Sequence, residues 1–152
     1  MHVRANTHIL DKAFVESIDA SAVEVIKPVN KMLFGEDRLI NDFQHKDLII
    51  LVAYVGEAVA GFKIGYGAGQ GMYYSAKSGV LPAFRRRGLA TKLLNRMILE
   101  VKIRGYGKMA FDTFPARFPG MMALGLKEGF KPVSAKWSPA YKDYQVRLEV
   151  KL

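Results

Sequence analysis

Three consecutive arginines, Arg85, Arg86 and Arg87, precede Gly88 and Ala90, where a segment with helical periodicity begins. The first turn of a helix leaves several backbone N–H groups without partners, all pointing the same way, and the helix dipole adds positive potential there. A glycine at that point removes a side chain from the path of an anion. The arginines add positive charge at the rim. This pattern predicts a turn that binds a phosphate group.

The helix that would supply this N-terminus is expected over residues 88–104. Apolar residues recur every fourth position from Leu89 to Val101 and form one stripe along it. Strands are expected on both sides of the helix, over residues 72–80 and 108–113. The short connections are typical of a strand–helix–strand unit, so the sequence predicts that the turn lies at the end of a sheet strand.

The rest of the chain alternates between helical and strand-like segments, without internal repeats. Ser21 and Glu24 have the spacing of a capping box, which predicts a helix running to Leu33 that is kinked or interrupted at Pro28. The whole pattern predicts a single α/β domain over residues 1–152, with a mixed sheet and helices on both faces. The other expected elements are a short helix over 37–43, a hairpin of strands 48–54 and 58–66, a short helix over 120–128, and a final hairpin of strands 130–137 and 144–150.

The composition is that of a chain able to bury a core, with 50% hydrophobic and 24% charged residues. There is no cysteine, which excludes disulfides, thiolate zinc sites, iron–sulfur clusters and a cysteine nucleophile. The longest apolar run, over residues 48–55, is too short to cross a bilayer, and the N-terminus lacks the apolar stretch of a secretory signal. A soluble cytoplasmic protein with no membrane partner is therefore expected.

The chain is strongly basic, with 23 Lys and Arg against 14 Asp and Glu and a formal net charge of +9. This balance favours an anionic partner. Because no aromatic residues interleave the basic residues of the expected helix, a phosphorylated small molecule is favoured and nucleic acid is the minor alternative. No metal ion is expected, since the three histidines are widely spaced and none pairs with a carboxylate at metal-ligand spacing. They are His2, His8 and His45.

The segment around the turn resembles the cofactor loop of the GCN5-related N-acetyltransferase (GNAT) family, which reads V-x-P-x-x-R/Q-x-x-G-x-G/A. A second motif of that family, a short helix that closes with Gly-Phe before a strand, resembles residues 121–130. The order of the expected elements also agrees over essentially the whole chain. The residues that fit the loop are Val80, Pro82, Arg85, Gly88 and Ala90.

The resemblance implies a site for acetyl-coenzyme A (acetyl-CoA). In the family, the loop amides hold the pyrophosphate, and the pantetheine arm lies between two parallel strands that splay apart in a mostly antiparallel sheet. The matching strands here are residues 72–80 and 108–113. The resemblance further implies direct transfer of the acetyl group to an amine of a small molecule or a peptide, with the N–H of Val80 or its neighbour stabilising the oxyanion. The residues that it assigns to the cofactor are Ser78, Gly79, Val80, Arg85, Arg86, Arg87, Gly88, Leu89 and Ala90.

Acyl transfer to an amine calls for a general base and a proton donor. Strand alternation places Asp112 near the C-terminal end of residues 108–113, where enclosure in the splayed gap would raise its pKa towards the working pH. Asp112 is therefore the candidate base; the alternative is that it pairs with a neighbouring Lys or Arg, or caps the following loop. Tyr74 and Tyr144 are the candidate proton donors by position, and water is the alternative.

The sequence departs from the family pattern at three points, one of which is that residues 72–80 offer no glutamate as a base. Many members carry a tyrosine four residues before the glycine of Gly-Phe, where this chain has Gly125. Many also carry an asparagine before the short helix, whereas residues 113–120 contain none. A catalytically idle member that binds coenzyme A for sensing or interaction is therefore the alternative function. The resemblance is also compatible with a homodimer.

Overall fold

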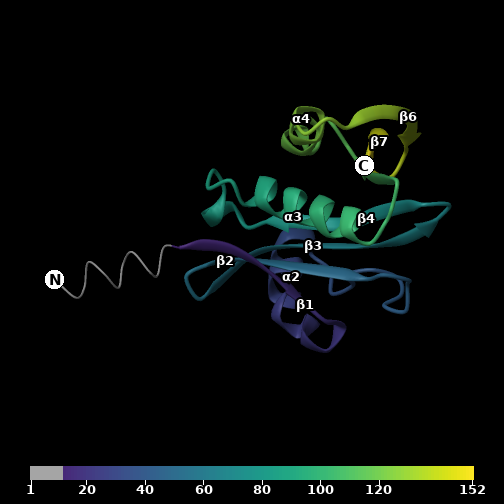
Figure 1. Cartoon of the computed structure of the whole chain (residues 1–152). Coiled ribbons are helices and arrows are strands. Elements are labelled where there is room, and N and C mark those ends of the chain that lie inside the picture. Colours follow the sequence, from purple (N-terminus) through teal and green to yellow (C-terminus); the bar gives the residue numbers. More distant parts are fainter. Residues whose placement is uncertain (1–11) are drawn as a thin grey trace.

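The structure, a computed structural model, describes residues 12–152, and over this range seven strands form one sheet (Figure 1). The strand order is β1-β2-β3-β4-β5-β7-β6. Among these residues only β4 and β5 pair in parallel, so the expected mixed sheet is confirmed. The strands are β1 (Ala13–Ile18), β2 (Ile49–Val55), β3 (Ala58–Gly69), β4 (Met72–Val80), β5 (Lys108–Thr113), β6 (Lys131–Ser138) and β7 (Asp143–Lys151); the helices are α2 (Lys27–Phe34), α3 (Leu89–Ile103) and α4 (Pro119–Lys127), with 3-10 turns η1 (Ala20–Val25) and η2 (Pro82–Phe84).

Helices cover both faces of the sheet, as expected, with α3 on one side and α2 on the other (Figure 1). Successive side chains of β2 alternate between the two cores on either face of the sheet. Leu51 and Ala53 belong to the core under α3, whereas Ile50 and Val52 belong to the core under α2. Because both faces are covered, β2 is apolar along its whole length rather than alternating. No helix within residues 12–152 is both long and apolar enough to cross a bilayer.

The parallel pair β4–β5 separates halfway along β4. Ser75 and Phe111 form the last pair between the two strands, and β4 continues to Val80 without a partner in β5. At the same level β4 carries one extra residue, Ala76, relative to β3. Such a β-bulge bends its strand and increases the local twist. The splayed pair implied by the family resemblance is therefore confirmed, and the bulge accounts for where it opens.

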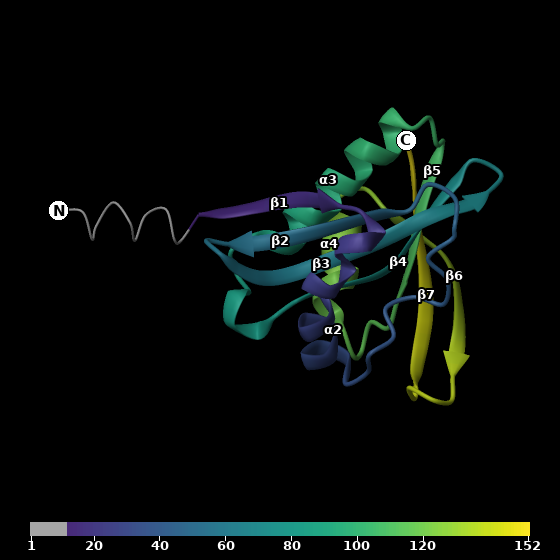
Figure 2. The ribbon, with the colours of Figure 1, turned by 90° about the horizontal axis from the view of Figure 1, so that it is seen from below.

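The C-terminal part of the sheet turns away from the rest. Figure 2 shows β5, β7 and β6 running across the direction of β1, β2 and β3. The final hairpin of β6 and β7 forms as expected, with β7 inserted between β6 and β5. Helix α4 packs on the α3 side of the sheet through Met121, Met122 and Leu124. The gap between β4 and β5 thus opens between two differently oriented halves of the sheet.

The start of the first helical segment differs from the expectation. The side chain of Asp19, rather than Ser21, acts as the N-cap, because it accepts a hydrogen bond from the N–H of Ser21 at 2.9 Å. The segment is interrupted, as expected, but into the 3-10 turn η1 and the helix α2. Pro28 lies at the start of α2, where its missing N–H costs no helix hydrogen bond.

Two further features of the N-terminal third differ from the sequence expectation. Residues 37–43 form no helix, because the buried Asn30 donates hydrogen bonds to the carbonyls of Glu36 and Arg38 and holds this segment as a loop. The strand β1 was not expected from the sequence. It pairs with β2 at the edge of the sheet, and exposed positions break its alternation.

Candidate active site

The turn between β4 and α3 presents a row of backbone N–H groups. Within residues 12–152, the N–H groups of residues 86–91 have no hydrogen-bond acceptor, and α3 begins without a side-chain cap. Arg86 and Gly88 have φ values of 65° and 74°, so the chain curls in left-handed conformations at both positions. Unpaired N–H groups at the start of a 15-residue helix make a site for an anion.

The space in front of this turn is open. A Cβ built on Gly88 would meet no atom within 4 Å. Arg85, Arg86 and Arg87 are exposed, and the Nε of Arg85 folds back to the carbonyl of Val80 at 3.1 Å. Leu89 is buried and anchors the helix start in the core. Backbone donors, an open approach and cationic side chains at the rim fit a pyrophosphate group.

The unpaired end of β4 leads directly into the turn. Ser78, Gly79 and Val80 are half-buried and pair with β3 on one side only, since β5 has separated from β4 by this point. The missing side chain of Gly79 has a separate cause, because a Cβ there would lie 2.6 Å from Cδ1 of Leu33 in α2. An open strand edge beside a helix N-terminus offers backbone hydrogen bonds to an extended ligand.

Asp112 lies in a network with Tyr74 and Arg147. The hydroxyl of Tyr74 donates to Oδ2 of Asp112 at 2.8 Å, across the parallel strand pair. The guanidinium of Arg147 donates to both carboxylate oxygens, at 2.9 and 3.0 Å, from the opposite position on β7. The same guanidinium lies 5.3 Å from the centre of the Tyr74 ring. The structure thus brings together two of the three predicted catalytic residues and adds an arginine to them.

The expected rise in the pKa of Asp112 is wrong. Burial does raise the pKa of this carboxyl, but the hydrogen bonds from Arg147 and Tyr74 outweigh it, and the pKa lies below its ordinary value. Burial and the hydrogen bond to Asp112 raise the pKa of Tyr74. Asp112 is therefore ionised and Tyr74 protonated around neutral pH. The pairing with an arginine that the sequence left as the alternative is confirmed, and the base role stays a prediction.

Tyr144 lies apart from this network. Its ring is 55% exposed and packs edge-on against Trp137, with 5.3 Å between the ring centres. Tyr144 and Arg147 are three residues apart on β7, so their side chains lie on opposite faces of the sheet. No hydrogen bond between described residues joins Tyr144 to Asp112.

The glycine at position 125 is required by packing. A Cβ on Gly125 would lie 2.7 Å from Cζ of Phe111 and 3.0 Å from Cδ1 of Leu148. The ring of Phe111 therefore occupies the space beside α4 into which a side chain at position 125 would extend. The departure from the family pattern at this position is matched by a large residue on the neighbouring strand.

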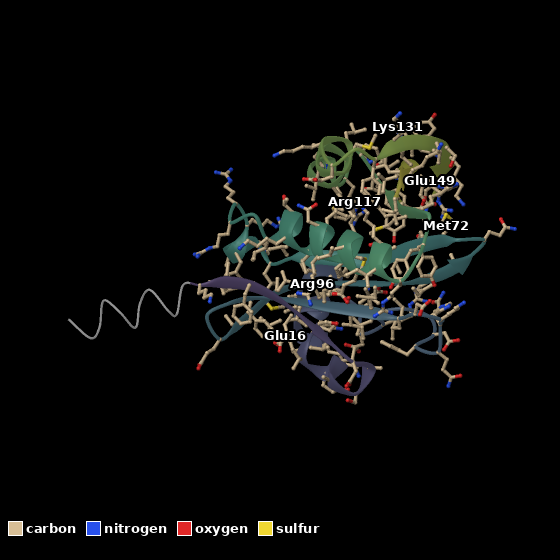
Figure 3. All side chains as sticks on the ribbon, in the orientation of Figure 1. Glu16, Met72, Arg96, Arg117, Lys131 and Glu149 are labelled. Atoms are coloured by element: carbon tan, nitrogen blue, oxygen red, sulfur yellow. The ribbon has the colours of Figure 1, made fainter. Side chains whose placement is uncertain are left out.

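Much of the positive charge on α3 is used within the fold. Lys92 reaches the carbonyl of Ala13, and Arg96 reaches both the carbonyl of Val15 and the carboxylate of Glu100. Figure 3 shows Arg96 on the side of α3 that faces β1. Through these contacts Lys92 and Arg96 hold the edge strand β1 against α3. The arginines of the turn are also exposed at the start of α3.

Of the three histidines, only His45 lies among the described residues. His45 stacks on Tyr66, with 3.7 Å between the ring centres, whereas His2 and His8 lie outside the described residues. Two surface hollows of the described chain lie away from the turn: one is bordered by Arg104 and Tyr106, and another lies over β5, β6 and β7.

One buried ionisable residue was missed by the sequence reasoning. Lys63, in the middle of β3, is only 1% exposed. Its Nζ lies 5.9 Å from the centre of the Phe111 ring on β5. The signal available in the sequence was a lone lysine in an apolar strand, between Phe62 and Ile64, which both face the α2 core.

Comparisons with known proteins point to one family and one fold. A family model described as "Acetyltransferase (GNAT) family" matches residues 14–129. No curated protein matches by sequence. Among solved structures, the ribosomal-protein alanine N-acetyltransferase from Escherichia coli has a TM-score of 0.75 at 14% identity, covering 92% of this chain and 94% of that one. NAA60 of Arabidopsis thaliana in complex with acetyl-CoA has a TM-score of 0.74 at 15% identity, covering 93% of this chain and 100% of that one.

Proposed function

The chain belongs to the acetyltransferase (GNAT) family, and we propose that it is an N-acetyltransferase that transfers the acetyl group of acetyl-CoA to a primary amine of a small molecule or a peptide. The observation that carries the proposal is the row of unpaired N–H groups at residues 86–91, which directly follows the end of β4 that has lost its partner. When bound, acetyl-CoA supplies an acetyl group activated as a thioester.

Each half of this surface suits one part of the cofactor. The N–H groups of residues 86–91 would bind the pyrophosphate, with Arg86 and Arg87 adding charge at the rim. The open edge of β4 at residues 78–80 would bind the pantetheine arm through backbone hydrogen bonds. The N–H of Val80 or its neighbour would stabilise the negative charge that develops on the acetyl oxygen.

The network of Asp112, Tyr74 and Arg147 would lie on the acceptor side of the gap. Asp112 is ionised and half-buried, and although Arg147 balances its charge, its oxygens would accept a further hydrogen bond from an acceptor amine. We keep Asp112 as the candidate base, either directly or through water. Tyr74 already donates a hydrogen bond to Asp112, and Tyr144 is 55% exposed and packs against Trp137, so we assign neither hydroxyl to protonation of the leaving sulfur.

A panel of acceptors tests the proposal and its alternative together. The purified protein is mixed with acetyl-CoA and with polyamines, aminoglycosides, simple amines and peptides with free N-termini, and release of free thiol is followed. Acceptor-dependent thiol release together with an acetylated product supports the transferase. Tight binding of acetyl-CoA with no thiol release across the panel would instead favour the idle member that uses the bound cofactor for sensing.

A further inference from the structure

Lys63 lies on the α3 face of the sheet, beside the splayed gap. It pairs in register with Ser78 of β4, and directly opposite residues share a face. Ser78 is three residues beyond Ser75, the last β4 residue with a partner in β5. Lys63 therefore lies at the level of the sheet where β4 no longer pairs with β5, beside the part of β4 assigned above to the pantetheine arm.

The side chain of Lys63 crosses β4 towards β5. Its Nζ lies 5.9 Å from the centre of the Phe111 ring, and Phe111 is the β5 residue at the last paired position. Since β3 and β5 are separated by β4, the lysine must extend over the serines of β4 to reach this ring. The amino group is thus placed at the point where the two parallel strands divide.

The amino group of Lys63 has no polar partner. Within the described range it makes no hydrogen bond or ion pair, and burial lowers its pKa to about 8. Of the ionisable side chains on β4 and α3, Tyr73 bonds to the carbonyl of Asp47, Lys92 to that of Ala13, and Arg96 to that of Val15 and to the carboxylate of Glu100, while Lys102 is exposed. A charged lysine that is only 1% exposed and has no hydrogen-bond partner among the described residues is costly to the fold, which calls for a reason to retain it.

Resting on the acetyl transfer proposed above, we propose that Lys63 is the proton donor to the sulfur of coenzyme A. The acceptor nitrogen bonds to the acetyl carbon, and the carbon–sulfur bond breaks with its electron pair on sulfur. The ammonium of Lys63 gives that sulfur a proton, which leaves a neutral amine on Lys63 and a free thiol on the product. Lys63 regains a proton from solvent, which balances the proton that the acceptor amine loses.

The chemistry suits a lysine in this place. Thiols and the buried amine have similar proton affinities, so little energy is lost in the transfer. Before the proton moves, a positive charge in a dry site stabilises the departing thiolate. Phe111 offers its ring face to the ammonium without competing for its protons.

The test compares Lys63→Met with Lys102→Met, which removes an exposed lysine of α3 that has no ion pair among the described residues. The first measurement needs no turnover. Coenzyme A is bound to each protein, and its thiol is titrated by the ultraviolet absorbance of the thiolate. In the wild type and in Lys102→Met, the nearby ammonium should lower the pKa of the bound thiol by about one to three units relative to Lys63→Met. Desulfo-coenzyme A, which lacks the sulfur, should bind all three proteins alike.

The kinetic measurement uses an acceptor found in the panel. Lys63→Met should lower kcat by about 10² to 10⁴ fold, the range for loss of a proton donor, with little change in the affinity for acetyl-CoA. Lys102→Met should match the wild type. The same bound-thiol pKa in wild type and Lys63→Met would overturn the inference, as would an acetylated Lys63 peptide in turned-over enzyme, since that would make the lysine a nucleophile. If the wild type binds no coenzyme A, the proposed function itself fails.

Discussion

Replacing Lys63 by methionine is expected to stabilise the fold while it impairs the reaction. Methionine has nearly the same length and leaves no charge to bury. Burial lowers the pKa of Lys63 from its ordinary 10.5 to about 8, and each unit corresponds to about 1.4 kcal/mol. The charged lysine therefore destabilises the wild type by roughly 3 kcal/mol at neutral pH. For a chain of this size that is a rise of about 6 to 12 °C in Tm for the variant.

The pH dependence of the stability difference between the two proteins shows whether the charge of Lys63 is its cause. Below pH 8 the lysine is charged in both the folded and the unfolded protein, so the whole cost is present. Between about pH 8 and 10.5 the folded protein loses this proton while the unfolded chain keeps it, and the stability of the wild type rises relative to the variant. The gap between the two proteins should therefore be largest at pH 7 and fall below about 1 kcal/mol at pH 10.

Urea denaturation of the two proteins at pH 7 and pH 10 measures this gap directly. Other titrating groups are common to both proteins and cancel in the difference, provided that the m-values agree. Equal stability at pH 7, or a gap that does not change with pH, would refute the reasoning, because the amino group would then be solvated or paired. A more stable but slower variant would show that the fold retains a costly charge for its function.

Two further predictions follow from the packing and the charge network. Gly125→Ala should lower the free energy of unfolding by about 1 to 2 kcal/mol, because its Cβ would clash with the ring of Phe111 and better helix propensity offsets only part of that cost. An unchanged free energy of unfolding would contradict this, as would a second substitution, Phe111→Leu, that restores none of the lost stability. Asp112→Asn should lower kcat by about 10² to 10⁴ fold at unchanged acetyl-CoA affinity if Asp112 is the base, and wild-type turnover would show that the proton leaves by another route. Since the pKa of Asp112 is lowered in the folded protein, its ionised carboxylate should stabilise the wild type at pH values above the ordinary carboxyl pKa, and this stabilisation should be lost as the pH falls through the lowered pKa. The Asn variant should lack this acid dependence.

Local patterns predicted the elements that form the candidate cofactor surface. The apolar stripe after the turn places α3 to within one residue at each end, and β4 and β5 have the expected bounds. These elements have strong periodicity or clear turn residues, so short-range information is enough. The prediction of a helix over residues 37–43 failed for the opposite reason. Its conformation is set by Asn30 and by Lys77, which bonds to Glu36 from a distant strand.

The arrangement of the candidate catalytic side chains depends on contacts that no local pattern contains. Alternation along β5 separated Asp112 from the face of Phe111, as the structure has it, but its partner Arg147 is 35 residues away along the chain. That contact reversed the expected direction of the pKa shift. Lys63 was overlooked because a polar residue within a strand normally marks a solvent-facing position. Only the covering of both faces of the sheet makes the same residue a buried cation.

We propose that the turn before α3 binds acetyl-CoA through its backbone N–H groups, and Gly88→Val tests this assignment against a matched control. Gly35, at the end of α2, has φ 69° and ψ 14°, close to the 74° and 15° of Gly88, and neither glycine has an atom within 4 Å of a built Cβ. Valine at either position therefore brings the same backbone strain, about 1 to 2 kcal/mol, but only at position 88 does it enter the path of the phosphate.

Calorimetric titration of acetyl-CoA into the wild type, Gly88→Val and Gly35→Val measures the difference, with thermal melting to confirm that both variants are folded. We expect the wild type and Gly35→Val to bind with the same affinity and Gly88→Val to bind at least about tenfold more weakly, a loss of 1.4 kcal/mol or more. Equal affinity for the two variants, or no binding by the wild type, would contradict the assignment of this turn as the cofactor site.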